Sequence, residues 1–206
     1  MPSMNRGILL IGPTGSGKTP LGCLLESRGL WSRKCFHFDF GEHLRRLASR
    51  EEGIAELGAK DIKVIRRVLE TGDVLENRNF HIARAILANF LNRRKVGRKD
   101  IIVLNGLPRH VDQARHVDTL IDIQFVVHLS CSAEVALERI RTNVGGDRTE
   151  RPDDDVESAK NRMIIFATRT APLLAHYRAM GVPVRKLEVT ATCRPEDLRR
   201  ALEISP

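Results

Sequence analysis

The sequence of 206 residues predicts an α/β fold of three layers, in which helices cover both faces of a central five-stranded parallel sheet. Two observations lead to this class. Short apolar runs alternate with helical patterns along the chain, as they do where each strand of a parallel sheet is followed by a crossover helix. The apolar runs are also continuous rather than interrupted by polar residues, which is typical of strands covered on both faces.

The predicted strands are bounded by polar residues or glycine, and we expect all five to be buried. They are Ile8 to Ile11, Cys35 to Phe38, Ile101 to Leu104, Phe125 to Leu129 and Val184 to Val189. The predicted helices are Lys18 to Arg28, Glu42 to Arg50, Ala59 to Glu70, Glu76 to Arg94, Val111 to Leu120, Ala133 to Arg141, Asp154 to Ala179 and Pro195 to Leu202. Gly72 follows the third of these as a stop signal.

The chain is long enough for one domain with a sizeable core, and two independent domains are not expected. About sixty residues separate the second and third strands, far more than one crossover helix requires, and they contain three helical segments. This stretch therefore predicts an inserted helical region. The segment from Thr142 to Pro152 is rich in Gly, Asp, Arg and Thr, and we interpret it as a mobile flap.

Composition narrows the class of partner. A net charge of +8 fits anionic partners such as nucleotides, nucleic acid or acidic membranes. Four cysteines without a C-x-x-C pair predict neither a zinc site nor a disulfide framework, so a reducing cytoplasm is the default. No apolar stretch approaches the 18 residues of a membrane span, and the N-terminus lacks the apolar region of a signal peptide.

The first apolar run leads into a glycine-rich loop. The eight residues from Gly12 to Thr19 read GPTGSGKT and match the phosphate-loop pattern G-x-x-x-x-G-K-[ST]. Glycines let successive N–H groups point at phosphate oxygens, and the helix that follows adds its positive end. Lys18 is expected to reach the β and γ phosphates and the Thr19 hydroxyl to face Mg²⁺. The plainer alternative is a turn that only joins strand to helix.

A second motif follows the third predicted strand. The residues from Leu104 to Ala114, LNGLPRHVDQA, resemble the D-G-[FY]-P-R-x-x-x-Q-A signature of adenylate kinases and related nucleoside monophosphate kinases. Further segments are similar to family motifs and occur in the family's order. They are His37 to Arg45, Gly72 to Leu75, Ala136 to Ile140, Arg151 to Asp154, Arg162, and Thr170 to Leu173.

This resemblance implies a single P-loop kinase domain over residues 1–206, with a monophosphate-binding insertion at about 40–84 and a short lid without zinc at about 141–155. It implies transfer of the γ-phosphoryl group of MgATP to a nucleoside monophosphate, AMP being favoured. The residues implied to bind ATP are Gly12, Gly15, Ser16, Gly17, Lys18, Thr19 and Arg139. Those implied to bind the acceptor are Phe40, Arg45, Asp73, Val74, Leu75, Gly106, Arg109 and Gln113. The catalytic set is Lys18, Arg109, Arg139, Arg151 and Arg162, and the Mg²⁺ set is Thr19 and Asn105.

The chain departs from the family pattern at two places near the phosphates. Pro20 follows the loop threonine and lacks an N–H donor, although proline is tolerated in the first turn of a helix. Asn105 stands where the family has an aspartate that binds Mg²⁺ through water, so metal attraction is expected to weaken. Whether Asp39 compensates, or only caps the next helix, is open at this level.

Alternatives also remain for specificity and class. Phe40 contacts the acceptor base or packs in the core, and Gln113 favours AMP over the UMP/CMP type because an amide offers a donor and an acceptor to adenine. A nucleotide-binding protein with decayed catalysis is the alternative that Pro20 and Asn105 suggest. A nucleic-acid-binding module is disfavoured by scarce aromatic residues, 4% of the chain. We therefore expect a cytoplasmic monomer that binds neither nucleic acid nor membranes.

Overall fold

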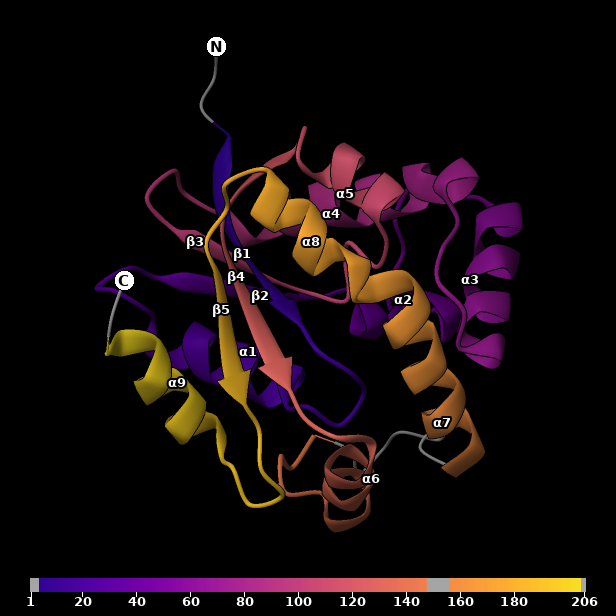
Figure 1. Cartoon of the computed structure of the whole chain (residues 1–206). Helices are drawn as coiled ribbons and strands as arrows, with labels where there is room; N and C mark the ends of the chain where they lie inside the picture. The colour runs from indigo at the N-terminus through magenta and orange to yellow at the C-terminus, as the bar shows by residue number, and fades with distance from the viewer. Residues whose placement is uncertain (1–3, 148–155, 205–206) are drawn as a thin grey trace.

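The computed structural model describes residues 4–147 and 156–204, and it contains a five-stranded parallel sheet with helices on both faces (Figure 1). The strands are β1 (Asn5–Ile11), β2 (Cys35–Asp39), β3 (Ile101–Asn105), β4 (Ile121–Ser130) and β5 (Val184–Glu188), in the order β2-β3-β1-β4-β5. The predicted fold class is confirmed. Because β1 is central, the loop that follows it lies in the middle of the sheet's carboxyl edge.

The sheet separates the core into two layers, and each layer is covered by helices. On one face, α1 (Lys18–Arg28) and α9 (Pro195–Glu203) pack against Ile8 and Leu10 of β1. On the other, α4 (Phe80–Arg94), α5 (Val111–Val117) and α8 (Pro172–Ala179) pack against Leu9 and Ile11. Successive residues of a strand point to opposite faces, so one apolar run supplies both layers. This explains why the central strands are continuous in apolar residues.

Four further helices lie toward the carboxyl edge of the sheet. They are α2 (Phe40–Ala48), α3 (Ala59–Thr71), α6 (Ala133–Thr142) and α7 (Val156–Ile165). In Figure 1, α3 stands at the side of the molecule and α6 lies beyond the arrowheads of β4 and β5. Among the described helices, none combines the length and the apolar character needed to cross a membrane.

Two sequence predictions about elements were wrong. The strand predicted from Val184 to Val189 is not buried: β5 forms an edge with β4 as its one neighbour, and none of its five residues is fully buried. The single helix predicted from Asp154 to Ala179 is instead α7, a π-helical turn at Phe166–Thr170, and α8. Pro172 cannot donate an N–H to continue the first helix, and the chain widens into the π turn before it.

Other boundaries differ by a turn or less. The helix expected to begin at Glu76 begins as a 3₁₀ turn at Asn77–Asn79, and α4 follows. The helix expected to begin at Glu42 begins at Phe40, because the Asp39 side chain caps it. The helix expected to reach Leu120 ends at Val117.

Candidate active site

The phosphate-loop motif forms the connection between β1 and α1. Gly15 and Gly17 adopt left-handed backbone angles, with φ of 83° and 90°, that favour glycine. A Cβ on Gly15 would also lie 2.5 Å from the Ala136 carbonyl oxygen, so the loop fits closely against α6. Helix α1 begins at Lys18 with no acidic residue in its first turn, which leaves its positive end suited to an anion.

The side chains of the loop support this shape. The Lys18 Nζ donates hydrogen bonds of 2.7 Å to the carbonyl oxygens of both Gly12 and Pro13. Ser16 is fully buried inside the loop. Pro20 lies in the first turn of α1, which continues through it without interruption.

A single cavity of about 180 Å³ connects this loop with the segments that sequence motifs associate with an acceptor. It lies at the carboxyl edge of the sheet, where ligands of open α/β folds bind. Of the predicted site residues, those that line it are Gly12, Gly15, Gly17, Lys18, Thr19, Phe40, Arg45, Asp73, Val74, Leu75, Asn105, Gly106, Arg109 and Arg162. They come from segments up to 150 residues apart, between Gly12 and Arg162. The fold therefore assembles most of the predicted set in one place.

Two arginines converge on the acceptor end of this cavity. Arg109 emerges from the loop after β3, and Arg162 reaches it from α7. Burial and the neighbouring positive charge of Arg162 lower the pKa of the Arg109 guanidinium to about 10, so it stays protonated at neutral pH. Two like charges this close repel each other, and an anion bound between them would remove the repulsion. The pair therefore suits a phosphate group.

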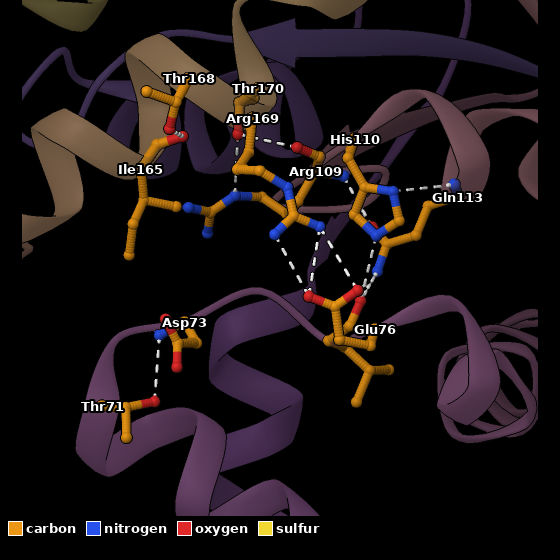
Figure 2. A network of polar contacts seen from close by, with 11 residues as sticks. Thr71, Asp73, Glu76, Arg109, His110, Gln113, Ile165, Thr168, Arg169 and Thr170 are labelled. Carbon is orange, nitrogen blue, oxygen red and sulfur yellow. Dashed lines mark hydrogen bonds and ion pairs between the residues drawn. The ribbon is translucent and has the colours of Figure 1, made fainter.

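The π turn positions Arg109. The Thr170 hydroxyl donates to the Arg109 carbonyl oxygen at 2.9 Å, and the Arg109 Nε lies 3.4 Å from the same hydroxyl. Figure 2 shows the two side chains facing each other, with Arg169 from the same turn paired with Glu76. Widening of the helix at Phe166–Thr170 thus places Thr170 on the cavity beside Arg109, while Arg169 pairs with Glu76 and is not among the described residues that line it.

Gln113 does not line the cavity. It is fully buried, its Nε2 donates to the Leu75 carbonyl oxygen at 2.6 Å, and its Oε1 accepts from the Arg109 N–H at 2.7 Å. His110 joins it: its Nδ1 accepts from the Gln113 N–H, so its Nε2 carries the hydrogen that bonds the Leu75 carbonyl oxygen at 3.2 Å. Figure 2 shows both side chains directed to this carbonyl. Together they hold the Asp73 to Leu75 turn against α5.

For Phe40 the structure shows the core packing that the sequence allowed, while contact with an acceptor base stays a prediction. It lines the cavity, yet only 3% of it is exposed, and its ring stacks on that of Phe38 at a centroid distance of 6.2 Å. It therefore forms part of the core and one wall of the cavity.

Arg139 lies behind the phosphate loop, and it is missing from the described residues that line the cavity. Only 3% of it is exposed, and its guanidinium donates to the carbonyl oxygens of Gly15, Thr190 and Cys193 at 2.9, 2.9 and 2.7 Å. It thus joins the loop to the segment between β5 and α9. Arg151, the other arginine predicted near the transferring group, lies outside the described residues.

Three polar side chains beside the loop offer the oxygen ligands that Mg²⁺ prefers. The Thr19 hydroxyl donates to the Asp39 carboxylate at 2.7 Å, and the Asn105 Nδ2 donates to both of them, at 3.0 and 2.8 Å. Carboxylate, hydroxyl and amide oxygens are hard ligands, which suit Mg²⁺ and the waters that it retains. The residues therefore fit a magnesium ion next to the phosphate loop. The role of Asp39 was open from the sequence, and His110 and Thr170 lay in motif segments without an assigned role; their contacts in the fold supply one.

The arrangement as a whole places an amide-lined anion site and a guanidinium pair at two ends of one cavity. Phosphoryl transfer between two bound substrates needs positioning and fixed positive charge more than covalent chemistry, so this geometry suits it.

Comparison with known proteins gives the family. No protein-family profile matches the chain. It is 31% identical over 183 residues to an adenylate kinase of Xanthomonas campestris pv. campestris, covering 84% of this chain and 86% of that protein. An adenylate kinase of Haloarcula marismortui is 28% identical over 199 residues, 84% and 85% of the two chains. A UMP-CMP kinase 2 of Caenorhabditis elegans is 27% identical over 183 residues, 87% and 86% of the two chains. With this likeness spanning more than four fifths of both chains, the chain belongs to the adenylate kinase family of nucleoside monophosphate kinases.

Proposed function

We propose that this enzyme transfers the γ-phosphoryl group of MgATP to AMP, giving two ADP. The observation that carries the proposal is the single cavity in which the phosphate loop and the Arg109–Arg162 pair face a common space. Substrates held at its two ends bring a donor phosphate and an acceptor phosphate together, which is the main requirement of this reaction.

The donor is proposed to bind along the phosphate loop. Backbone N–H groups from Gly12 to Thr19 and the positive end of α1 hold its phosphates, and Lys18 exchanges its two carbonyl partners for phosphate oxygens. Arg139 fixes the loop from behind; to reach the nucleotide it would leave its carbonyl partners. When bound beside Thr19, Mg²⁺ neutralises phosphate charge.

The acceptor is proposed to bind between Arg109, Arg162 and Arg45 of α2, all of which line the cavity. A guanidinium binds two phosphate oxygens at once and stays charged, so it suits this task better than lysine. Asp73 to Leu75 lie along the base, with Phe40 as a wall. Residues 40–84 are proposed as the acceptor-binding insertion.

Water is the competing acceptor, so the cavity has to close before transfer. Residues 141–155 are proposed as the lid that closes it, with Arg151 carried toward the transferring group. Asp147, the last described residue before the gap, already lines the cavity. The four cysteines are free, which fits our proposal of a monomer in the reducing cytoplasm.

Preference for AMP rests on Gln113, whose amide is bonded to Leu75 and Arg109. An adenine edge would have to take over one of these bonds. A pyrimidine acceptor is the second candidate, because the C. elegans relative is named a UMP-CMP kinase.

A panel of AMP, CMP, UMP and GMP with ATP and Mg²⁺, followed by chromatographic detection of the diphosphates, tests the proposal. We expect the highest kcat/KM with AMP. Equal or faster turnover of CMP or UMP would reject the AMP assignment and leave the reaction class intact. Tight ATP binding without turnover of any acceptor would reject the reaction itself and indicate decayed catalysis.

A further inference from the structure

We infer that Asp39 supplies the carboxylate charge of the magnesium site, and that it has taken over this role from the position of Asn105. The inference rests on the proposed binding of MgATP at the phosphate loop. It assigns a function to a residue at the end of β2, one strand further from the loop than β3.

The position next to Thr19 on the neighbouring strand lacks a carboxylate. In P-loop enzymes the metal is held by the threonine or serine after the loop lysine together with an aspartate. Here Thr19 follows Lys18, and the strand beside β1 ends in Asn105, whose amide is neutral. A site with no carboxylate beside Thr19 would lose much of its attraction for a divalent cation.

The Asp39 carboxylate lies within hydrogen-bond distance of Thr19. Asp39 and Asn105 are the terminal residues of β2 and β3 and are paired in register. The Asp39 Oδ2 lies 2.7 Å from the Thr19 hydroxyl and 2.8 Å from the Asn105 Nδ2. The carboxylate of the outer strand thus reaches past β3 to the residue expected to face the metal.

The hydrogen bonds among Thr19, Asp39 and Asn105 all end on the oxygen atoms of Thr19 and Asp39. Thr19 donates its hydroxyl hydrogen to Asp39, and Asn105 donates its amide hydrogens to Thr19 and to Asp39. With its hydrogen donated to Asp39 and one lone pair accepting from Asn105, the Thr19 hydroxyl presents its remaining lone pair, not a proton, to a cation. Asn105 is therefore a positioning residue, because its amide donates to both oxygen groups and aligns them.

A hydrogen bond to the start of α2 fixes the Asp39 side chain. Its Oδ1 accepts the Glu42 N–H at 3.0 Å and caps α2, and the residue is 8% exposed while lining the cavity. A cap and a metal-side carboxylate use different oxygens of one group, so the two roles are compatible. Asparagine also caps helices well, so a change to asparagine removes charge and keeps the cap.

Binding of a fluorescent ATP analogue, measured with Mg²⁺ and with a chelator instead, tests the inference without turnover. A carboxylate beside the phosphates repels metal-free ATP and favours MgATP. In Asp39→Asn we expect metal-free ATP to bind more tightly and MgATP more weakly, so that the ratio of the two affinities falls about tenfold or more. A purely structural defect would weaken both.

A double variant tests whether a carboxylate moved from β2 to β3 restores the effect of Mg²⁺ on ATP binding. The double variant Asp39→Asn/Asn105→Asp returns the carboxylate to β3 and should restore the Mg²⁺ effect. Asn105→Asp alone adds a second carboxylate, so metal-free ATP should bind more weakly than to the wild type and the ratio should rise. Asp122→Asn is the matched control, since it removes one carboxylate at the amino end of β4, and Asp122 is not among the described residues that line the cavity.

An unchanged ratio in Asp39→Asn, an equal or larger loss in Asp122→Asn, or a double variant as impaired as the single one would each overturn the inference. If Asp39→Asn does not fold, Asn105→Asp decides: because a carboxylate is already present beside Thr19, its ratio should rise by less than about tenfold, and a larger rise would show that the wild-type site lacks one. Wild-type protein that binds MgATP but phosphorylates no acceptor would reject the proposed function and leave this inference standing.

Discussion

Lys18 illustrates how the neighbours of a residue set its role. Its ammonium group bridges two carbonyl oxygens of its own loop, a position from which a short movement reaches phosphate. Arg109 is similar: its charge is held beside a like charge until an anion arrives. In the proposed reaction both groups carry positive charge that is already in the cavity before a substrate binds, which reduces the rearrangement needed for transfer.

Lys18→Ala should lower phosphoryl transfer at least about a hundredfold, because a preorganised positive group at the transferring phosphate is lost. Coupled ADP assays measure this, and circular dichroism checks that the fold is retained. Lys60→Ala, which removes an exposed lysine of α3, is the control and should leave the rate as in the wild type. Equal rates in the two variants would show that the loop is not the donor site.

At the scale of elements, α1 depends on close packing against β2. Gly22 of α1 faces His37, and a Cβ there would lie 2.2 Å from the His37 Nε2. The imidazole is 8% exposed and has little room to move. This contact sets how near the helix after the phosphate loop lies to the strand that carries Asp39.

Gly22→Ala should therefore destabilise the fold although alanine favours helices. Overpacking at this distance costs about 3 kcal/mol and helix propensity returns about 1, leaving a net loss of about 2 kcal/mol in the free energy of unfolding. Urea denaturation measures it. Gly53→Ala is the control, since a Cβ there meets nothing within 4 Å. A loss no larger than that of the control would contradict the packing argument.

At the scale of the whole molecule, charge governs the response to pH. The chain already carries a net charge of +8 at pH 7, and protonation of its histidines in acid adds to the repulsion between its positive charges. Burial lowers the pKa of His37 and of His128, and for His128 the nearby charges of Lys186 and Arg178 lower it further. Both rings are therefore held neutral in the folded protein more strongly than in the unfolded chain.

The sign of the effect follows from proton uptake. Unfolded histidines have a pKa of about 6.5, so below this pH the unfolded chain binds more protons than the folded one, and stability falls as pH falls. We expect the urea midpoint to drop between pH 7.5 and pH 5.5. In His128→Gln, which cannot titrate at this position, the drop should be smaller. Parallel pH profiles for the two proteins would show that His128 does not contribute.

The sequence by itself determined the parts of this protein that depend on local pattern. Continuous apolar runs predicted five buried strands, of which β5 is the exception, and the loop from Gly12 to Thr19 predicted a strand–loop–helix unit. Both predictions were possible because glycine backbone freedom and apolar periodicity act over a few residues. The order of motifs predicted the family.

Tertiary structure decided what depends on the order of strands and on distant neighbours. Only the pairing of β2 with β3 brings Asp39 to Asn105 and Thr19. Helix packing separates the two edge strands: β2 is buried where α1 and α4 contact it, whereas β5 is half exposed. Arg139 bonds backbone carbonyls from segments more than fifty residues away, which no spacing rule predicts. Such contacts form because the sheet closes long loops, and the residues that then meet share no local signal in the chain.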